Sequence, residues 1–192
     1  AKNAVLHGAG REDIDARMVG TGRPFILEVV SPKKRSVDLA ALEAAINWTA
    51  DGRVSVAIKR WADRAEVETL KSNKAHKKYR ILVEVEGVLS ADEIANALKS
   101  LKGVTIQQRT PERVAHRRAD KIRERKVLDI EYAGAQDGRF VVEVLGEAGL
   151  YIKELVSGDS GRTIPSLAEI LKRKAHVTSL DVTQVEGAKE GE

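Results

Sequence analysis

The chain has 192 residues, of which 42% are hydrophobic, so it can form a packed core, and this composition argues against global disorder. It contains no cysteine and only four histidines, which excludes disulfides and thiolate metal sites and argues against a zinc site. The net charge is +4. No apolar run approaches the roughly 18 residues that would cross a membrane, and no leader opens the chain, so we expect a protein of the cytoplasm or, in a eukaryote, of the nucleus.

The first half of the chain mixes charged stretches without periodicity and short amphipathic segments. Residues 9–24 are rich in glycine and charge, which indicates a loop. Val54, Val56 and Ile58 alternate with other residues, as in a half-buried strand. The expected elements are a strand at 25–30, a helix at 37–50, a strand at 53–61, a short helix at 65–70 and a strand at 78–86.

The second half predicts a capped helix followed by a hairpin. Ser90 can cap a helix that runs to about residue 101, with Glu93 completing a capping box, and Gly103 ends it. Beyond it we expect a strand at 104–108, hairpin strands at 126–132 and 139–145, helices at 150–156 and 166–171, a strand at 176–185 and a frayed, disordered tail at 187–192. Because strands outnumber helices and hairpin connections recur, the sequence predicts an α+β fold with a mainly antiparallel sheet flanked by helices.

Basic residues are concentrated in one segment of the chain. They are Arg109, Arg113, Arg117, Arg118, Lys121, Arg123, Arg125 and Lys126, opposed only by Glu112, Asp120 and Glu124. Such a cluster suits a polyanion such as an RNA backbone. The plainer alternative is that these arginines pair with surface acids such as Glu112 and Glu124 and touch no RNA.

A charged motif, GREDIDAR, lies at residues 10–17. On spacing alone, charged residues beside glycine most often form a solvated turn. Here Arg11 and Arg17 bracket Asp13 and Asp15, so a carboxylate can stay ionised beside phosphates. A carboxylate held next to a cation can act as a nucleophile or a base, which makes this loop a candidate for catalysis.

The same loop, with the GTGRPF that follows at residues 20–25, resembles the catalytic loop of a tRNA pseudouridine synthase family of archaea and eukaryotes. Members of that family modify uridines in the T-arm of tRNA, at positions fifty-four and fifty-five. The resemblance implies a pseudouridine synthase fold, with its sheet in two lobes. It also implies that Asp13 is the catalytic aspartate and that Arg11 displaces the target base.

Two further motifs resemble the same family. Tyr79, preceded by lysines that could hold phosphate, would be the active-site tyrosine that packs on the uracil ring, although a tyrosine opening a strand is usually a core residue. In the AGLYIKEL at residues 148–155, the resemblance makes Lys153 the basic residue that pairs with Asp13 and Ile152 a pocket-lining side chain. Leu180 would close the pocket from the last strand, with plain core packing as an equal alternative.

The resemblance covers nearly the whole chain and makes residues 1–192 a catalytic domain, without the N-terminal RNA-binding region that family members carry. In the segment 110–120, which also resembles the family, Arg117 and Arg118 would be RNA contacts.

We therefore expect a tRNA pseudouridine synthase that needs no cofactor and no metal, with tRNA as its partner and no membrane association. Asp13 would act either by attack at C1′ or by proton removal at C2′; the sequence does not choose between them, and it leaves the oligomeric state open. One alternative is an RNA-binding module without catalysis. Another is a metal-dependent nuclease using Glu12, Asp13 and Asp15, although neighbouring side chains of an extended loop point in different directions.

Overall fold

Two separate sheets organise residues 1–186, which are the residues described by this computed structural model. A two-stranded sheet belongs to a first unit, formed by Ala1–Gly10 and Pro24–Asn73. A seven-stranded sheet belongs to a second unit, formed by Arg11–Arg23 and the chain from Lys74 onward. Within residues 1–186, no helix has the length and apolar character needed to cross a membrane. The predicted tail at 187–192 lies outside the described residues.

The first unit combines an antiparallel strand pair with two helices. β1 (Asn3–Gly8) pairs with β3 (Phe25–Val30), and α2 (Arg64–Ser72) contacts β1. The other helix, α1 (Leu39–Ala50), is capped by the side chain of Asp38. β3, α1 and α2 confirm the strand and the two helices expected at these places, whereas β1 was not predicted.

The strand predicted at residues 53–61 is wrong. The backbone of Val56 hydrogen-bonds to the side chain of Asn47 in both directions, at 2.8 and 2.9 Å, and Ile58 N–H donates to a carboxylate oxygen of Glu43 at 2.5 Å. Asn47 and Glu43 both belong to α1, so this segment satisfies backbone groups from a helix instead of a neighbouring strand. The segment with alternating apolar residues therefore does not pair with another strand.

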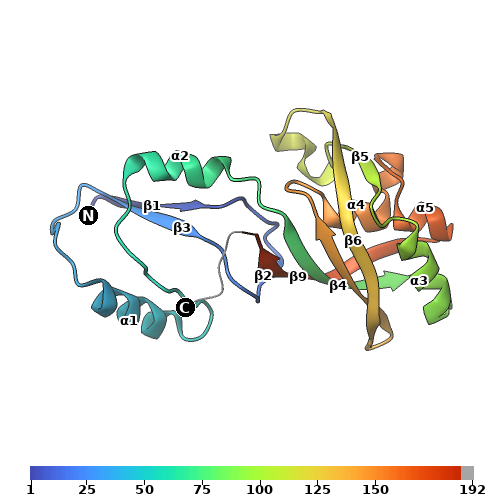
Figure 1. The fold of residues 1–192 in the computed structure, drawn as a ribbon, viewed down its shortest axis with the longest axis horizontal. Helices are drawn as coiled ribbons and strands as arrows, with labels where there is room; N and C mark the ends of the chain where they lie inside the picture. The colour runs from blue at the N-terminus through green and yellow to red at the C-terminus, as the bar shows by residue number, and fades with distance from the viewer. Residues whose placement is uncertain (187–192) are drawn as a thin grey trace. The chain divides into compact units, whose positions relative to one another are not determined.

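The seven-stranded sheet of the second unit has the order β2-β9-β4-β7-β6-β5-β8. Figure 1 labels its strands β2, β4, β5, β6 and β9. Its strands are β2 (Ala16–Met18), β4 (Lys77–Val85), β5 (Thr105–Arg109), β6 (Ile122–Gln136), β7 (Arg139–Gly146), β8 (Thr163–Ile164) and β9 (Ala175–Val185). Every neighbouring pair is antiparallel except β2 with β9. The predicted α+β fold with a mainly antiparallel sheet is thus confirmed.

The hairpin of β6 and β7 is longer than predicted. β6 begins at Ile122, inside the basic segment, and reaches Gln136, so the turn shrinks to Asp137 and Gly138. Both turn residues have positive φ, 50° and 73°, as the two-residue hairpin turn requires. β2 and β8 were not predicted, because strands this short carry no readable periodicity.

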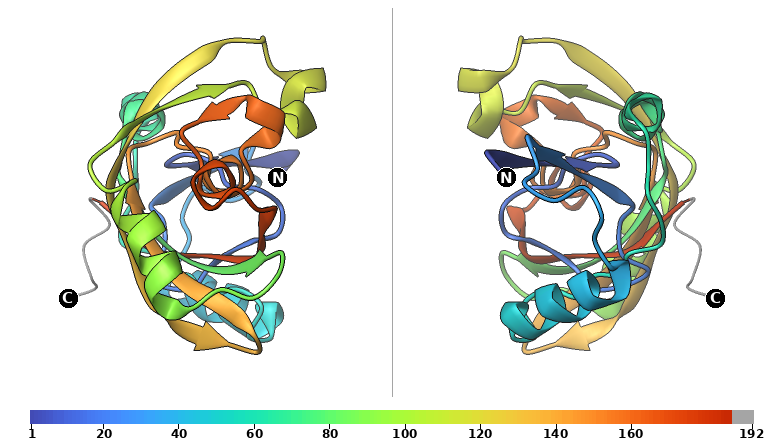
Figure 2. Two further views of the ribbon diagram at one scale, coloured as in Figure 1. Left: turned by 90° about the vertical axis from the view of Figure 1, so that its right-hand side faces the viewer. Right: turned by 90° about the vertical axis from the view of Figure 1, so that its left-hand side faces the viewer.

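Three helices cover one face of this sheet. They are α3 (Ala91–Lys99), α4 (Ile152–Ser157) and α5 (Leu167–Leu171), and the strands curve around the orange α4 and α5 in Figure 2. Two short 3-10 turns, η1 (Glu112–Arg117) and η2 (Asp159–Gly161), complete the unit. The predicted capping box is confirmed, with Ser90 and Glu93 exchanging hydrogen bonds at the start of α3.

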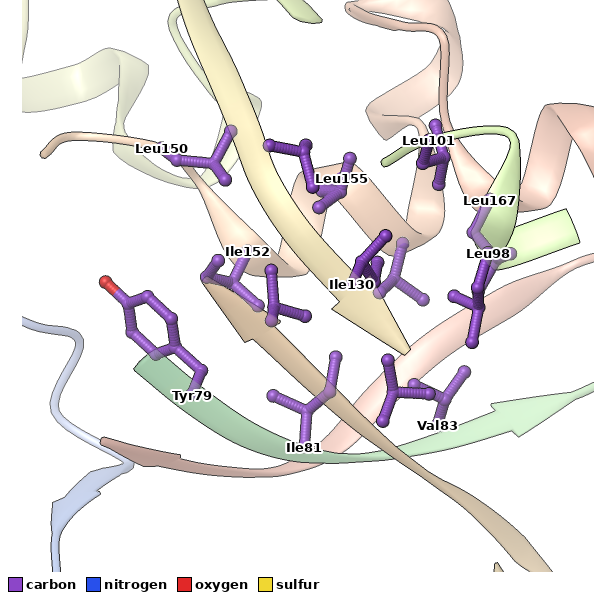
Figure 3. Packing of buried hydrophobic residues seen from close by; sticks show 14 of the residues in the cluster. Tyr79, Ile81, Val83, Leu98, Leu101, Ile130, Leu150, Ile152, Leu155 and Leu167 are labelled. Carbon is purple, nitrogen blue, oxygen red and sulfur yellow. The ribbon is translucent and has the colours of Figure 1, made fainter. Parts of the chain in front are cut away.

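The alternation along β4 separates a core face from a charged face. Tyr79, Ile81 and Val83 are buried in the apolar cluster beneath the helices, part of which Figure 3 shows. On the other face, Lys78 pairs with Glu143 of β7 at 2.5 Å. Tyr79 lies at one end of the apolar cluster, with its hydroxyl turned away from the aliphatic side chains (Figure 3). This end of the core borders the site described next.

Candidate active site

A cleft of about 480 Å³ in the second unit collects nearly all the residues singled out from the sequence. Its lining comes from the loop before β2, the start of β4, η1, β6, the first turn of α4 and β9. The predicted site residues found there are Arg11, Asp13, Tyr79, Arg117, Arg118, Ile152 and Leu180. Lys153 does not line the cleft.

Asp13 is paired with an arginine that the sequence had assigned only to a basic cluster. Arg113 Nη1, from η1, donates to Asp13 Oδ1 at 2.6 Å. The same guanidinium donates from Nε and Nη2 to the buried carboxylate of Glu154, at 2.6 and 3.2 Å. Burial opposes the charge of Arg113, but its hydrogen bonds to Glu154 and Asp13 outweigh that effect and raise its pKa. A permanent cation therefore stands beside Asp13.

Lys153 was expected to pair with Asp13, and this expectation was wrong. Lys153 Nζ instead contacts Asp15 Oδ2 at 2.6 Å, while Arg113 takes the place beside Asp13. The hydrogen bond from Lys153 lowers the pKa of Asp15. The two aspartates are two residues apart on the loop, and each faces a different cation. Such a choice between two nearby carboxylates depends on side-chain directions that spacing along the sequence does not contain.

A third carboxylate, that of Glu12, organises the inner end of the cleft. Glu12 Oε1 lies 2.8 Å from Arg23 Nη2 and 2.5 Å from Lys77 Nζ. Lys77 is buried, and Lys78 pairs with Glu143 on the charged face of the sheet, so these two lysines serve ion pairs inside the unit. The idea that the lysines before Tyr79 hold phosphate is therefore not supported.

Tyr79 is a neutral phenol in this setting. Burial raises its pKa first, and the nearby Glu12, which also accepts its hydrogen bond, raises it further. Its hydroxyl stays protonated throughout the physiological range and can donate but not act as a base. What Tyr79 can offer a planar base is the surface of its ring.

Apolar side chains complete the floor of the cleft. Tyr79, Ile152 and Leu180 are each about 95% buried, with 4%, 4% and 5% of their surface exposed. Ile152 opens α4, and Leu180 lies in β9 next to Ala16 of β2. A carboxylate beside an apolar, aromatic floor is an arrangement that can act on a base and its sugar after the base has left its stack.

The lining of the cleft is strongly cationic. Seven basic side chains line it, against the two carboxylates of Glu12 and Asp13. Among residues 1–186, the side chain of Arg117 has no hydrogen-bond or ion-pair partner, and the side chain of Arg118 contacts only the hydroxyl of Tyr151, at 3.2 Å. By contrast, Arg109 lies outside the cleft and pairs with Asp120 at 2.5 Å. The alternative of ion pairs with surface acids therefore fits Arg109 but not Arg117 or Arg118.

The acids of the loop do not form a metal site of the kind a nuclease would use. Glu12, Asp13 and Asp15 each face a different cation: Lys77 with Arg23, then Arg113, then Lys153. Three carboxylates that diverge in this way cannot ligate one ion. The part of the chain that the structure describes contains no group of three or more potential metal-ligating residues.

Comparison with known proteins gives a consistent result. The sequence model of the family described as "Pus10, C-terminal" matches residues 1–186. Proteins named "tRNA pseudouridine synthase Pus10" from Halorubrum lacusprofundi and Archaeoglobus fulgidus are 52% and 51% identical to this chain, over 97% and 96% of its length. These alignments cover 44% and 51% of the relatives, so the chain spans about half the length of the curated relatives it matches.

A solved structure shares the fold of part of this chain. One chain in the crystal structure of a Cbf5-Nop10-Gar1 complex superposes with a TM-score of 0.50 at 29% identity, covering 62% of this chain and 32% of that chain. The family match extends over all the described residues and includes the loop of Asp13 and the motifs of Tyr79 and Lys153. The resemblance indicated by the three motifs is therefore confirmed: the chain belongs to the Pus10 C-terminal family of tRNA pseudouridine synthases.

Proposed function

We propose that this chain catalyses the isomerisation of uridine to pseudouridine in tRNA, with Asp13 as the catalytic carboxylate. The observation that carries the proposal is the position of Asp13 in a cationic cleft whose floor is formed by Tyr79, Ile152 and Leu180. The names of the curated relatives point to the same activity. Since the chain matches only about half of each, activity and substrate are proposed here for this chain.

The reaction breaks the C1′–N1 bond, turns the base and joins C1′ to C5, while N1 gains a proton and C5 loses one. The target base must leave its stack to reach Asp13. In the proposal Arg11, exposed at the rim, fills the gap, and the ring of Tyr79 holds the uracil. Asp13 then acts at the sugar, by attack at C1′ or by removing a proton from C2′.

The substrate fits the charges of the cleft. The free guanidinium of Arg117 and the neighbouring Arg118 face a polyanion without competing acids, which suits the phosphates of tRNA. We propose uridines of the T-arm, at positions fifty-four and fifty-five, as the targets. An enzyme of this kind meets tRNA in the cytoplasm, or in the nucleus of a eukaryote.

The proposal is tested by incubating the protein with an unmodified tRNA transcript and mapping pseudouridine, with and without a chelator. We expect conversion in the T-arm that a chelator leaves unchanged. An RNA-binding module without catalysis would bind the transcript and convert nothing. Chain cleavage that stops with the chelator would support the nuclease instead.

A further inference from the structure

Glu154 is a buried acid that the three motifs do not account for. It lies in the first turn of α4, directly after Lys153, and only 5% of its side chain is exposed. A carboxylate is costly to bury unless it is paired and hydrogen-bonded. Arg113 supplies that pairing with Nε and Nη2, which lie 2.6 and 3.2 Å from the two carboxylate oxygens. Such a two-point contact fixes the plane of the guanidinium as well as its position.

The remaining terminal nitrogen of Arg113, which does not contact Glu154, points at Asp13, the proposed catalytic group. Arg113 Nη1 donates to Asp13 Oδ1 at 2.6 Å. Arg113 comes from η1 and Asp13 from the loop before β2, a separation of 100 residues. Neither side chain is held by its own element at this point: a 3-10 turn and an irregular loop meet here. The guanidinium, fixed by a helix, is what joins them.

The positive charge of the cleft explains why Arg113 needs Glu154 as a second carboxylate partner. The cleft is built to attract phosphates, and an arginine at its surface with one carboxylate partner could turn away from that partner to a phosphate. With both Nε and Nη2 engaged by Glu154, Arg113 cannot turn without leaving a buried carboxylate unpaired. Arg113 thus differs from Arg117, which is free to contact RNA.

We infer that Glu154 and Arg113 are positioning residues: Glu154 fixes Arg113, and Arg113 holds Asp13 in its reactive orientation. The inference rests on the proposed function, because only that function makes an orientation of Asp13 reactive. Its geometry rests on the three hydrogen bonds of Arg113. It extends the set of functional residues beyond those indicated by the motifs. Misplacing a reacting group by about 1 Å can cost on the order of a hundredfold in rate.

The test is a double-mutant cycle on the maximal single-turnover rate of pseudouridine formation. Glu154→Gln keeps the shape of the side chain and removes its charge, and Arg113→Gln removes the contact to Asp13. Each should lower the rate about 10- to 100-fold, while the Kd for tRNA changes about twofold or less. Because Glu154 acts through Arg113, the double variant should be no slower than Arg113→Gln. The matched control is Glu112→Gln, an exposed acid beside Arg113, which should keep the full rate.

Several results would overturn the inference. Full activity of Glu154→Gln would do so, and so would effects of the two changes that multiply in the double variant. If Glu154→Gln does not fold, Arg113→Lys decides: lysine keeps the charge but cannot hold two carboxylates in one plane, so we expect a loss like that of Arg113→Gln, and a wild-type rate would contradict us.

Failure of the proposed function can be told apart from failure of this inference. Were the wild-type protein to form no pseudouridine, a crystal structure of Glu154→Gln, or of Arg113→Lys if that is the variant that folds, would still test the geometry. Loss of the contact between residue 113 and Asp13, with the rest of the unit unchanged, would support the positioning role. An unchanged Asp13 would refute it.

Discussion

Asp13 and Asp15, in the loop before β2, lie two residues apart but in different surroundings. The Asp13 side chain is 26% exposed and contacts an arginine that a buried acid holds in place. The Asp15 side chain is 60% exposed and forms an ion pair with Lys153, which is not anchored in this way. An exposed ion pair of this kind contributes little to the stability of the fold. An ion pair that is anchored by a buried group has a defined geometry. The two carboxylates thus differ in whether a buried group anchors their cation, and this difference is the basis for proposing a catalytic role for Asp13 alone.

The largest expected effect separates these two aspartates. Asp13→Asn keeps size and shape but can act neither as a base nor as a nucleophile, so the single-turnover rate should fall at least about a thousandfold. The matched change Asp15→Asn should stay within about tenfold of the wild type. Thermal unfolding of both variants checks that each remains folded. Equal losses in the two variants would remove the distinction between the residues.

Tyr79 should show the next largest effect, and it acts through its ring. Tyr79→Leu loses the stacking surface, worth about 1–3 kcal/mol per base, so the rate should fall about 10- to 100-fold. Tyr79→Phe keeps the ring and loses a hydroxyl that remains protonated and bonded to Glu12, so it should stay within about tenfold of the wild type. A severe loss in Tyr79→Phe with little loss in Tyr79→Leu would show that the hydroxyl, not the ring, matters.

The rim of the cleft should affect binding and leave the chemical step alone. Replacing Arg117 and Arg118 together by Ala should reduce the slope of log affinity against log salt by about two units, roughly one for each lost phosphate contact. Binding should weaken similarly for different RNAs, because phosphates carry no sequence information. Arg109→Ala is the control, since Arg109 already pairs with Asp120 outside the cleft. An unchanged slope in the double variant would mean that neither arginine touches RNA.

The smallest effect concerns the exposed pair of Asp15 and Lys153. The hydrogen bond from Lys153 lowers the pKa of Asp15 in the folded protein, so the pair stabilises the fold above the unfolded pKa of about 3.9. This stabilisation is lost as the pH falls through the lowered pKa. Solvent screening limits it to about 0.5 kcal/mol. Between pH 7 and pH 3, the free energy of unfolding in urea should fall slightly less for Asp15→Asn than for the wild type. A larger fall for the variant would contradict this prediction.

The sequence predicted much of the second unit because its signals are local. The capping box of Ser90 and Glu93 and the alternation of Tyr79, Ile81 and Val83 both depend on residues close along the chain. Residues 53–61 alternate in the same way and form no strand, since a strand also needs a neighbour, and here α1 supplies the hydrogen bonds. Periodicity therefore predicts an extended chain but not its pairing.

The site was predicted in the same uneven way. The motifs identified Asp13, Tyr79, Ile152 and Leu180 as site residues, and the structure places all four in one cleft. The partner of Asp13 could not be predicted, because Arg113 lies 100 residues away and its role depends on the buried Glu154. A useful signal was nevertheless present: an acid, Glu154, directly precedes the apolar Leu155 and Val156 in a short helical segment. A charge on a buried face indicates a partner even when the sequence cannot name it.

The most direct test of the central claim follows the hydrogen at C5 of uridine, which leaves only if C1′ becomes joined to that carbon. A tRNA transcript carrying uridine tritiated at C5 is incubated with the wild-type protein and with Asp13→Asn, and the tritium released to water is counted. We predict that the wild type releases tritium from T-arm uridines and that Asp13→Asn releases none. Release by Asp13→Asn at the wild-type rate, or no release by either protein, would contradict the assignment of Asp13 as the catalytic carboxylate.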